Sequence, residues 1–148
     1  MDGVSGIFAV ISLAIQVLDT VHKTSGFVKD IQDAPRELIE LSETLEQLEL
    51  VLQEVNLLLQ QRYMVLRLPG SPIVLLRALE ACGRRVMPLQ DIIQKAREIM
   101  GQGSRAQRTW ASFKLVTKKE RLRELQKCLR DAKFDMSTAM TVNLSQLQ

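Results

Sequence analysis

The sequence predicts an all-α protein, an up-and-down bundle of four long helices plus one short helix. Apolar residues recur at steps of three and four over most of the chain, and no segment alternates as a strand does. The turns between these periodic segments are short, so consecutive helices should pack as antiparallel neighbours. The 148 residues suit one domain, 1–148, and a composition of 46% hydrophobic and 25% charged residues is that of a globular protein.

The first expected helix, 3–24, contains the most hydrophobic stretch of the chain. Residues 3–18 carry no charge, but this run of 16 falls short of the roughly 20 residues that span a bilayer. A helix that is apolar over most of its circumference must be surrounded by protein or lipid. Small and polar residues occupy only one narrow stripe of it, consisting of Ser5, Ala9, Ser12, Gln16, Asp19 and Lys23.

The second and third expected helices, 35–66 and 72–100, each bury one apolar seam. Asp33 can cap the second helix and Pro35 fits its first turn. The sequence 67–72 is the clearest turn signal, and Pro88 should kink the third helix because it cannot donate to the carbonyl of Arg84. The seam of the second helix comprises Leu38, Leu41, Leu45, Leu48, Leu52, Val55 and Leu59, and that of the third Leu75, Leu79, Cys82, Val86, Leu89, Ile93, Ala96 and Met100.

The C-terminal third contains a loop at 101–104, a short helix or bent lead-in at 105–113 and a last helix at 116–143. The short segment carries the only tryptophan, Trp110. Residues 143–148 contain neither glycine nor proline, which favours a domain cut from a longer protein. The last helix has the coiled-coil spacing of Leu122, Leu125, Leu129, Ala132, Met136, Ala139 and Asn143.

Residues with catalytic or metal-binding potential are few. The only histidine, His22, has no Cys, Asp or Glu at metal-ligand spacing, so a helix-surface contact with Asp19 is its expected role. Cys82 and Cys128 both fall in apolar-periodic stretches and indicate buried thiols in a reducing compartment. No phosphate-binding, zinc-protease or nucleophile-elbow motif occurs in the sequence. We therefore expect a protein that is not an enzyme, with no metal and no cofactor.

The charge of the chain is strongly asymmetric. Residues 105–133 contain ten basic and three acidic side chains, although the whole chain has a net charge of only +3. This pattern has two interpretations: a solvated helix face paired with the glutamate-rich second helix, or a surface that attracts anionic lipid headgroups. Nucleic acid is the disfavoured anion, because Trp110 and Phe113 are more typical of an aromatic plug at a bundle end than of a stacking platform. The candidate lipid-headgroup residues are Lys114, Lys118, Lys119, Arg121, Arg123 and Lys127.

This layout resembles the HeLo-like helical domains at the N-termini of fungal STAND (NOD-like) receptors and prion-linked cell-death effectors. The resemblance covers most of the chain. It rests on the apolar first helix that starts at Met1-Asp2, on the segments 28–31 and 34–38, on the leucine seam, on the stretch 78–82, and on a tryptophan before a basic last helix.

The resemblance implies a cell-death execution or signalling domain whose first helix leaves the bundle and inserts into membrane on activation. The protein would then be cytoplasmic at rest and would move to the plasma membrane, with anionic lipids and further copies of itself as partners, and an upstream receptor or downstream domain attached. The alternative is an interaction or oligomerisation module of a fungal NOD-like receptor without membrane activity. The residues carried over as membrane-inserting are Gly3, Gly6, Ile7, Phe8, Val10, Ile11, Leu13, Ile15 and Leu18.

Overall fold

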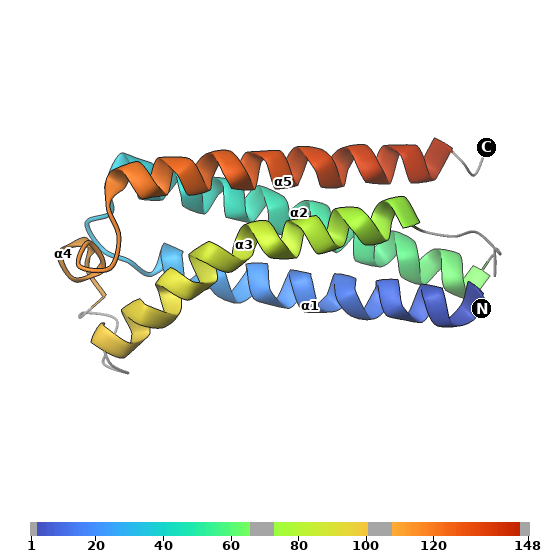
Figure 1. The fold of residues 1–148 in the computed structure, drawn as a ribbon, viewed down its shortest axis with the longest axis horizontal. Helices are drawn as coiled ribbons and strands as arrows, with labels where there is room; N and C mark the ends of the chain where they lie inside the picture. Colours follow the sequence, from blue (N-terminus) through green and yellow to red (C-terminus); the bar gives the residue numbers. More distant parts are fainter. Residues whose placement is uncertain (1–2, 66–72, 101–107, 146–148) are drawn as a thin grey trace.

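A computed structural model describes residues 3–65, 73–100 and 108–145, and the side chains of 8–61, 73–100 and 108–142. The fold is an all-α bundle of four long helices and one short helix, which confirms the predicted fold class (Figure 1). The helices are α1 (Gly3–Lys29), α2 (Arg36–Val65), α3 (Ile73–Met100), α4 (Trp110–Phe113) and α5 (Lys119–Ser145).

The four long helices alternate in direction, and the neighbours expected from short turns are found for α1 with α2 and for α3 with α5, but not for α2 with α3. In Figure 1, α1 and α5 form opposite edges of the bundle while α2 and α3 lie between them at different depths. The main interfaces are α1 with α2, α1 with α3, α5 with α2, and α5 with α3. The expectation that α2 and α3 pack as antiparallel neighbours is therefore wrong, because they stand diagonally across the bundle. Gly83 faces α1 in this arrangement, because a Cβ atom there would lie 3.7 Å from Cγ2 of Val17, an ordinary contact distance.

The core follows the predicted seams closely. All seven seam residues of α2 from Leu38 to Leu59 are buried, as are Leu75 to Ala96 at their predicted steps in α3. In α5, Leu122, Leu125 and Leu129 are almost fully buried. Each buried side chain of this size contributes about 1.5–3 kcal/mol relative to exposure, so these seams supply most of the driving force for folding.

The first helix extends past the end expected near Thr24, and continues to Lys29. Thr24 and Ser25 are buried, and the Thr24 hydroxyl donates to the carbonyl oxygen of Thr20 at 2.7 Å. Thr24 thus satisfies its hydroxyl inside the helix instead of ending it. Phe27 is buried one turn later, and this burial favours the additional helical residues.

The second helix begins after Pro35 rather than at a cap on Asp33. The Pro35 carbonyl oxygen accepts from the backbone N–H groups of Leu38 and Ile39 at 3.0 and 3.1 Å. Asp33 instead has a φ of 58°, a left-handed conformation that aspartate tolerates better than most residues. It therefore contributes to the turn between α1 and α2.

The remaining helices differ from expectation mainly at their ends. α3 stays helical through Pro88, and it bends along its course in Figure 1. α4 is confined to four residues, with Thr109 as its N-cap accepting from the backbone N–H of Ser112, and α5 begins at Lys119 rather than near 116. The predicted turn at 67–72 and the loop at 101–104 lie outside the described residues.

Candidate functional site

The predicted membrane-inserting residues of α1 fall on two sides of the helix. Val10 is buried in the core. Phe8 and Ile15, by contrast, are 52% and 49% exposed. The side chains of Gly3, Gly6 and Ile7 are not among those described. The partly buried members that pack against the core are Ile11, Leu13 and Leu18.

The expectation that α1 is surrounded on most sides is therefore wrong. As a corner of the bundle, α1 packs mainly against two helices, α2 and α3. Its small and polar stripe, including Ser12, Gln16 and Asp19, faces solvent. Ile15 widens this exposed side. Across the described residues, we find no helix with the length and apolar character needed to cross a membrane.

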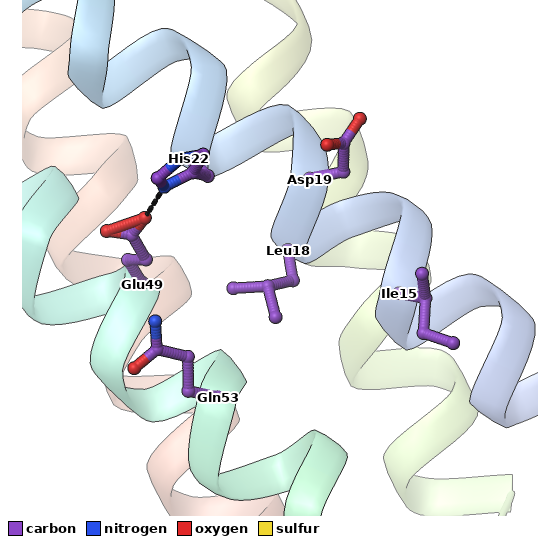
Figure 2. A pocket seen from close by; sticks show the side chains of 6 residues that line it. All are labelled: Ile15, Leu18, Asp19, His22, Glu49 and Gln53. Atoms are coloured by element: carbon purple, nitrogen blue, oxygen red, sulfur yellow. Dashed lines mark hydrogen bonds and ion pairs between the residues drawn. The ribbon is translucent and has the colours of Figure 1, made fainter.

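A groove lies between α1 and α2 beside this exposed side (Figure 2). Its volume is about 300 Å³, and Ile15 and Leu18 provide its apolar lining from α1. Glu49 and Gln53 line it from α2. The groove is thus an apolar floor with polar groups along its edges, the usual composition of a site that binds another molecule.

One end of the groove is closed by a contact between Nδ1 of His22 and a carboxylate oxygen of Glu49 (Figure 2). His22 therefore makes its surface contact with α2 and not with Asp19, which pairs instead with Lys23 at 3.0 Å between Nζ and Oδ2. Within the described part of the chain, no three His, Cys, Asp or Glu side chains gather as a metal site.

A second ion pair joins α1 to α2 next to this contact. Nζ of Lys29 lies 2.6 Å from Oε1 of Glu46. The hydrogen bond to Glu46 raises the pKa of Lys29, and the nearby Glu49 carboxylate acts in the same direction. Both side chains are largely exposed, so the pair orients the surface more than it stabilises the fold.

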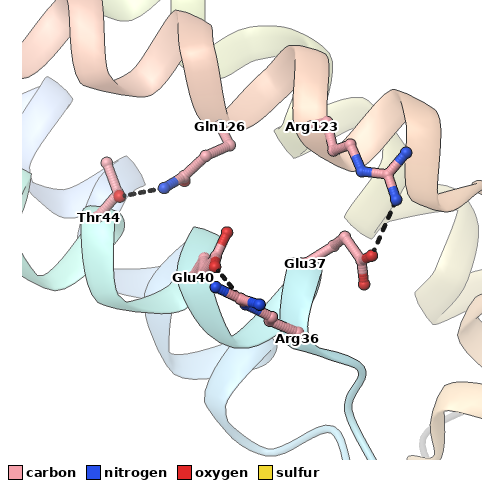
Figure 3. Close-up of polar contacts among 6 residues, drawn as sticks. All are labelled: Arg36, Glu37, Glu40, Thr44, Arg123 and Gln126. Carbon is pink, nitrogen blue, oxygen red and sulfur yellow. Dashed lines mark hydrogen bonds and ion pairs between the residues drawn. The ribbon is translucent and has the colours of Figure 1, made fainter.

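The predicted lipid-headgroup residues lie on α5 and just before it, and two of them have acidic partners. Arg123 donates to Glu37 of α2 at 3.1 Å (Figure 3). Arg121 donates to Glu124 within α5 at 2.9 Å. Among the described residues, no ion pair engages Lys114, Lys118, Lys119 or Lys127.

The Arg123 contact places a basic residue of α5 at the N-terminal end of α2. Glu37 lies in the first turn of α2, and a hydrogen bond from its own backbone N–H lowers the pKa of its carboxyl. Arg123 and Lys119 act in the same direction. Part of the basic cluster therefore pairs with the glutamate-rich helix, while the four lysines face solvent.

The two candidate surfaces do not meet. The N-terminal half of α1 lies at one end of the bundle, whereas α4 and the start of α5 lie at the opposite end (Figure 1). The sequence suggested a docking surface and an inserting helix that act together. In the structure, α1 and α5 begin at opposite ends of the bundle (Figure 1).

Trp110 and Phe113 form the aromatic plug that the sequence favoured at a bundle end. The ring centroids of Trp110 and Phe113 are 6.1 Å apart, and those of Phe113 and Phe27 are 6.4 Å apart. The guanidinium groups of Arg97 and Arg108 lie 5.3 and 5.2 Å from the centroid of the Phe27 ring. Phe27 and Phe113 are buried and Trp110 is partly buried against the core, so the three rings pack together at this end of the bundle.

The two cysteines occupy different environments. Cys82 is buried, and burial raises the pKa of its thiol to about 12. Cys128 is exposed on α5, so the expectation that both thiols are buried is wrong for this residue. Cys128 directly precedes Leu129 of the seam, which explains why its neighbourhood looks apolar in the sequence.

Several exposed apolar residues were missed by the sequence reasoning, and three of them matter below. Leu50 and Leu57 on α2 are 60% and 58% exposed, and Phe134 on α5 is 70% exposed. All three lie off the heptad seams of their helices, and this position is the signal that could have found them.

The bundle is thus a helical module with a groove on one face. The family model described as SesA, an N-terminal domain on NACHT NTPases and P-loop NTPases, matches residues 4–133. The chain therefore belongs to the SesA family, and the resemblance to N-terminal domains of fungal NOD-like receptors is confirmed at this level. Neither the curated proteins nor the solved structures include a significant match.

Proposed function

We propose that this chain is a non-enzymatic signalling module that acts by binding another protein through the face formed by α1 and α2. The observation that carries the proposal is the groove lined by Ile15 and Leu18, which sits on a helix pair that the bundle leaves open on one side. A SesA domain is found on NTPases, so a binding face would connect an attached NTPase to its effector.

The test uses the protein with its attached NTPase and compares two single substitutions at exposed apolar positions. Ile15→Glu places a charge at the groove, and Ile99→Glu places the same charge on α3, where the side chain is 55% exposed. The measurement is the signalling response of cells that express each variant. We expect Ile15→Glu to abolish this response and Ile99→Glu to preserve it. Circular dichroism should show equal helicity for both. Full signalling by the Ile15→Glu protein would overturn the proposal.

A second candidate function is membrane perturbation, with the protein cytoplasmic at rest and at the plasma membrane on activation. Two observations favour it: the half-exposed Phe8 and Ile15 on an uncharged helix segment, and the four lysines that face solvent at the other end. In this case α1 would leave the bundle and several copies would insert together, with the lysines docked on anionic lipid.

Leakage of anionic vesicles tests this candidate. We expect charge reversal at Lys114, Lys118 and Lys127 to prevent vesicle binding without unfolding the bundle, because none of the three has an ion-pair partner among the described residues. Reversal of Arg123 would be less informative, since that side chain also holds Glu37. The matched control reverses Arg77, Arg84 and Lys95, three exposed residues of α3. Vesicles that stay intact with a clustered wild-type chain would exclude membrane activity.

A further inference from the structure

We infer that the partner of the groove is a second copy of this chain, which inserts the outward face of its α5. This inference rests on the proposed function and deepens it by naming what binds to the face formed by α1 and α2. The receiving face consists of the groove residues Ile15, Leu18, Glu49 and Gln53 together with Glu46, which precedes Glu49 by three residues on α2. The inserting face consists of Lys127, Arg130 and Phe134.

The inserting face is an aromatic side chain with basic neighbours. Phe134 is 70% exposed, which is exceptional for a phenylalanine on an otherwise polar helix surface. Arg130 and Lys127 precede it by four and seven residues, so the three side chains share one face of α5. No ion pair to Lys127 or Arg130 occurs among the described residues. An exposed aromatic residue beside arginine is the usual composition of an interface centre.

The receiving face is complementary in polarity and in charge. Its floor is apolar through Ile15 and Leu18, and the neighbouring outer surface of α2 adds the exposed Leu50 and Leu57. Its edge is acidic through Glu46 and Glu49. Their present partners are Lys29 and His22 of α1. The pair of Lys29 with Glu46 is about half exposed on both sides and exchanges readily, whereas Glu49 is only 15% exposed and meets a partner through its outer edge.

The spacing of the two faces matches residue for residue. On α2, Glu46, Glu49 and Gln53 follow each other at steps of three and four, and on α5, Lys127, Arg130 and Phe134 do the same. If α5 of one copy lies parallel to α2 of the next, Lys127 lies over Glu46 and Arg130 over Glu49. Phe134 then reaches the level of Gln53, beside the apolar floor.

The two faces belong to different sides of one molecule. The groove lies between α1 and α2, whereas α5 stands diagonally across the bundle from α1. One chain therefore cannot fill its own groove, and pairing between copies is head-to-tail. Such contacts build rings or open chains and not simple two-fold dimers.

Sedimentation over a broad range of concentrations tests the inference on this chain. We expect the wild-type protein to form species larger than dimers, and we expect Phe134→Ser and Ile15→Lys each to be monomeric. Because each of these variants keeps one intact face, their mixture should form a one-to-one pair and nothing larger. Leu115→Ser is the matched control, because Leu115 is also 70% exposed but lies outside both faces. It should assemble like the wild type.

A charge exchange tests the register. Lys127→Glu and Glu46→Lys should each weaken association at least about tenfold, because each sets like charges opposite one another. The double variant with both substitutions has the same net charge as the wild type and should regain assembly. A wild-type chain that stays monomeric at every concentration, or a double variant no better than its parents, would overturn the inference. If the Ile15→Glu protein nevertheless lost signalling, the proposed binding function would stand with a different partner.

Discussion

The seam between α2 and α5 contains one buried polar contact. Nε2 of Gln126 donates to Oγ1 of Thr44 at 2.8 Å, and both residues are buried (Figure 3). Most positions around them are leucines, so this contact is the main polar constraint on how α5 sits against α2. A buried hydrogen bond of this kind changes the free energy of unfolding only slightly when both partners are present. Removal of one partner lowers the free energy of unfolding much more, because the other polar group stays buried without a bond.

We expect Thr44→Val to lower the free energy of unfolding by about 1–3 kcal/mol, because it leaves the Gln126 amide buried without its acceptor. Thr44→Val combined with Gln126→Leu should recover most of that loss, since neither side then carries a polar group. Urea denaturation followed by circular dichroism measures all four proteins of this double-mutant cycle. Losses that simply add would show that the two side chains are not coupled.

Single residues also set the limits of what the sequence could predict. The leucine seam was predictable because periodicity reports burial directly. The end of α1 was not, because Thr24 and Ser25 resemble a stop until Phe27 is seen to be buried. The contact of His22 with Glu49 joins two helices and has no signature in local spacing.

At the scale of elements, α4 and the segment before it close one end of the bundle. Backbone N–H groups of Gln32 and Trp110 are bonded reciprocally, to the carbonyl oxygens of Arg108 and Gln32, at 2.8 and 2.9 Å. Arg108 also approaches Asp30, with Nη1 and Oδ2 3.4 Å apart. The turn after α1 is thereby joined to the start of α4, and Phe113 is buried beneath the junction.

We expect Phe113→Ala to lower the free energy of unfolding by about 3–5 kcal/mol, because it removes a fully buried ring and leaves a cavity between Phe27 and Trp110. Leu115→Ala, two residues along the chain but exposed, should cost less than about 0.5 kcal/mol. Thermal and urea denaturation of both variants gives the comparison. Equal losses would mean that α4 is not part of the cooperative unit.

At the scale of the whole molecule, the order of helices around the bundle was the part that local patterns could not predict. A short turn allows two consecutive helices to lie either side by side or diagonally across the bundle. Which arrangement forms depends on which helix faces pack together. Gly83 faces Val17 in the interface of α3 with α1, and Thr44 is bonded to Gln126 in the interface of α2 with α5. The candidate site was partly predictable for the same reason: the polar stripe of α1 was evident in the sequence, but its exposure to solvent and the pairing of α1 with α2 into a groove were not.

The arrangement permits a direct test of whether α1 works inside the bundle or leaves it. A Cβ atom on Gly83 would lie 3.7 Å from Cγ2 of Val17, and the Sγ atom of a cysteine at position 17 can take the place of that Cγ2. Cysteines at the two positions would therefore lie within reach of one another. We therefore expect Val17→Cys with Gly83→Cys to form a disulfide between α1 and α3, in a background that carries Cys82→Ala and Cys128→Ser. The oxidised protein should unfold at a higher temperature than the reduced one.

The oxidised form separates the two candidate functions. If binding through the groove is the function, the tethered chain keeps its groove and should assemble and signal like the reduced chain. If α1 must insert into membrane, oxidation should block vesicle leakage and reduction should restore it. The background protein without the new cysteine pair controls for the reductant itself. The disulfide holds α1 by its buried side, so the exposed face of α1 with Ile15 stays accessible. Loss of assembly on oxidation would therefore contradict the proposal that the groove binds its partner while α1 remains in the bundle.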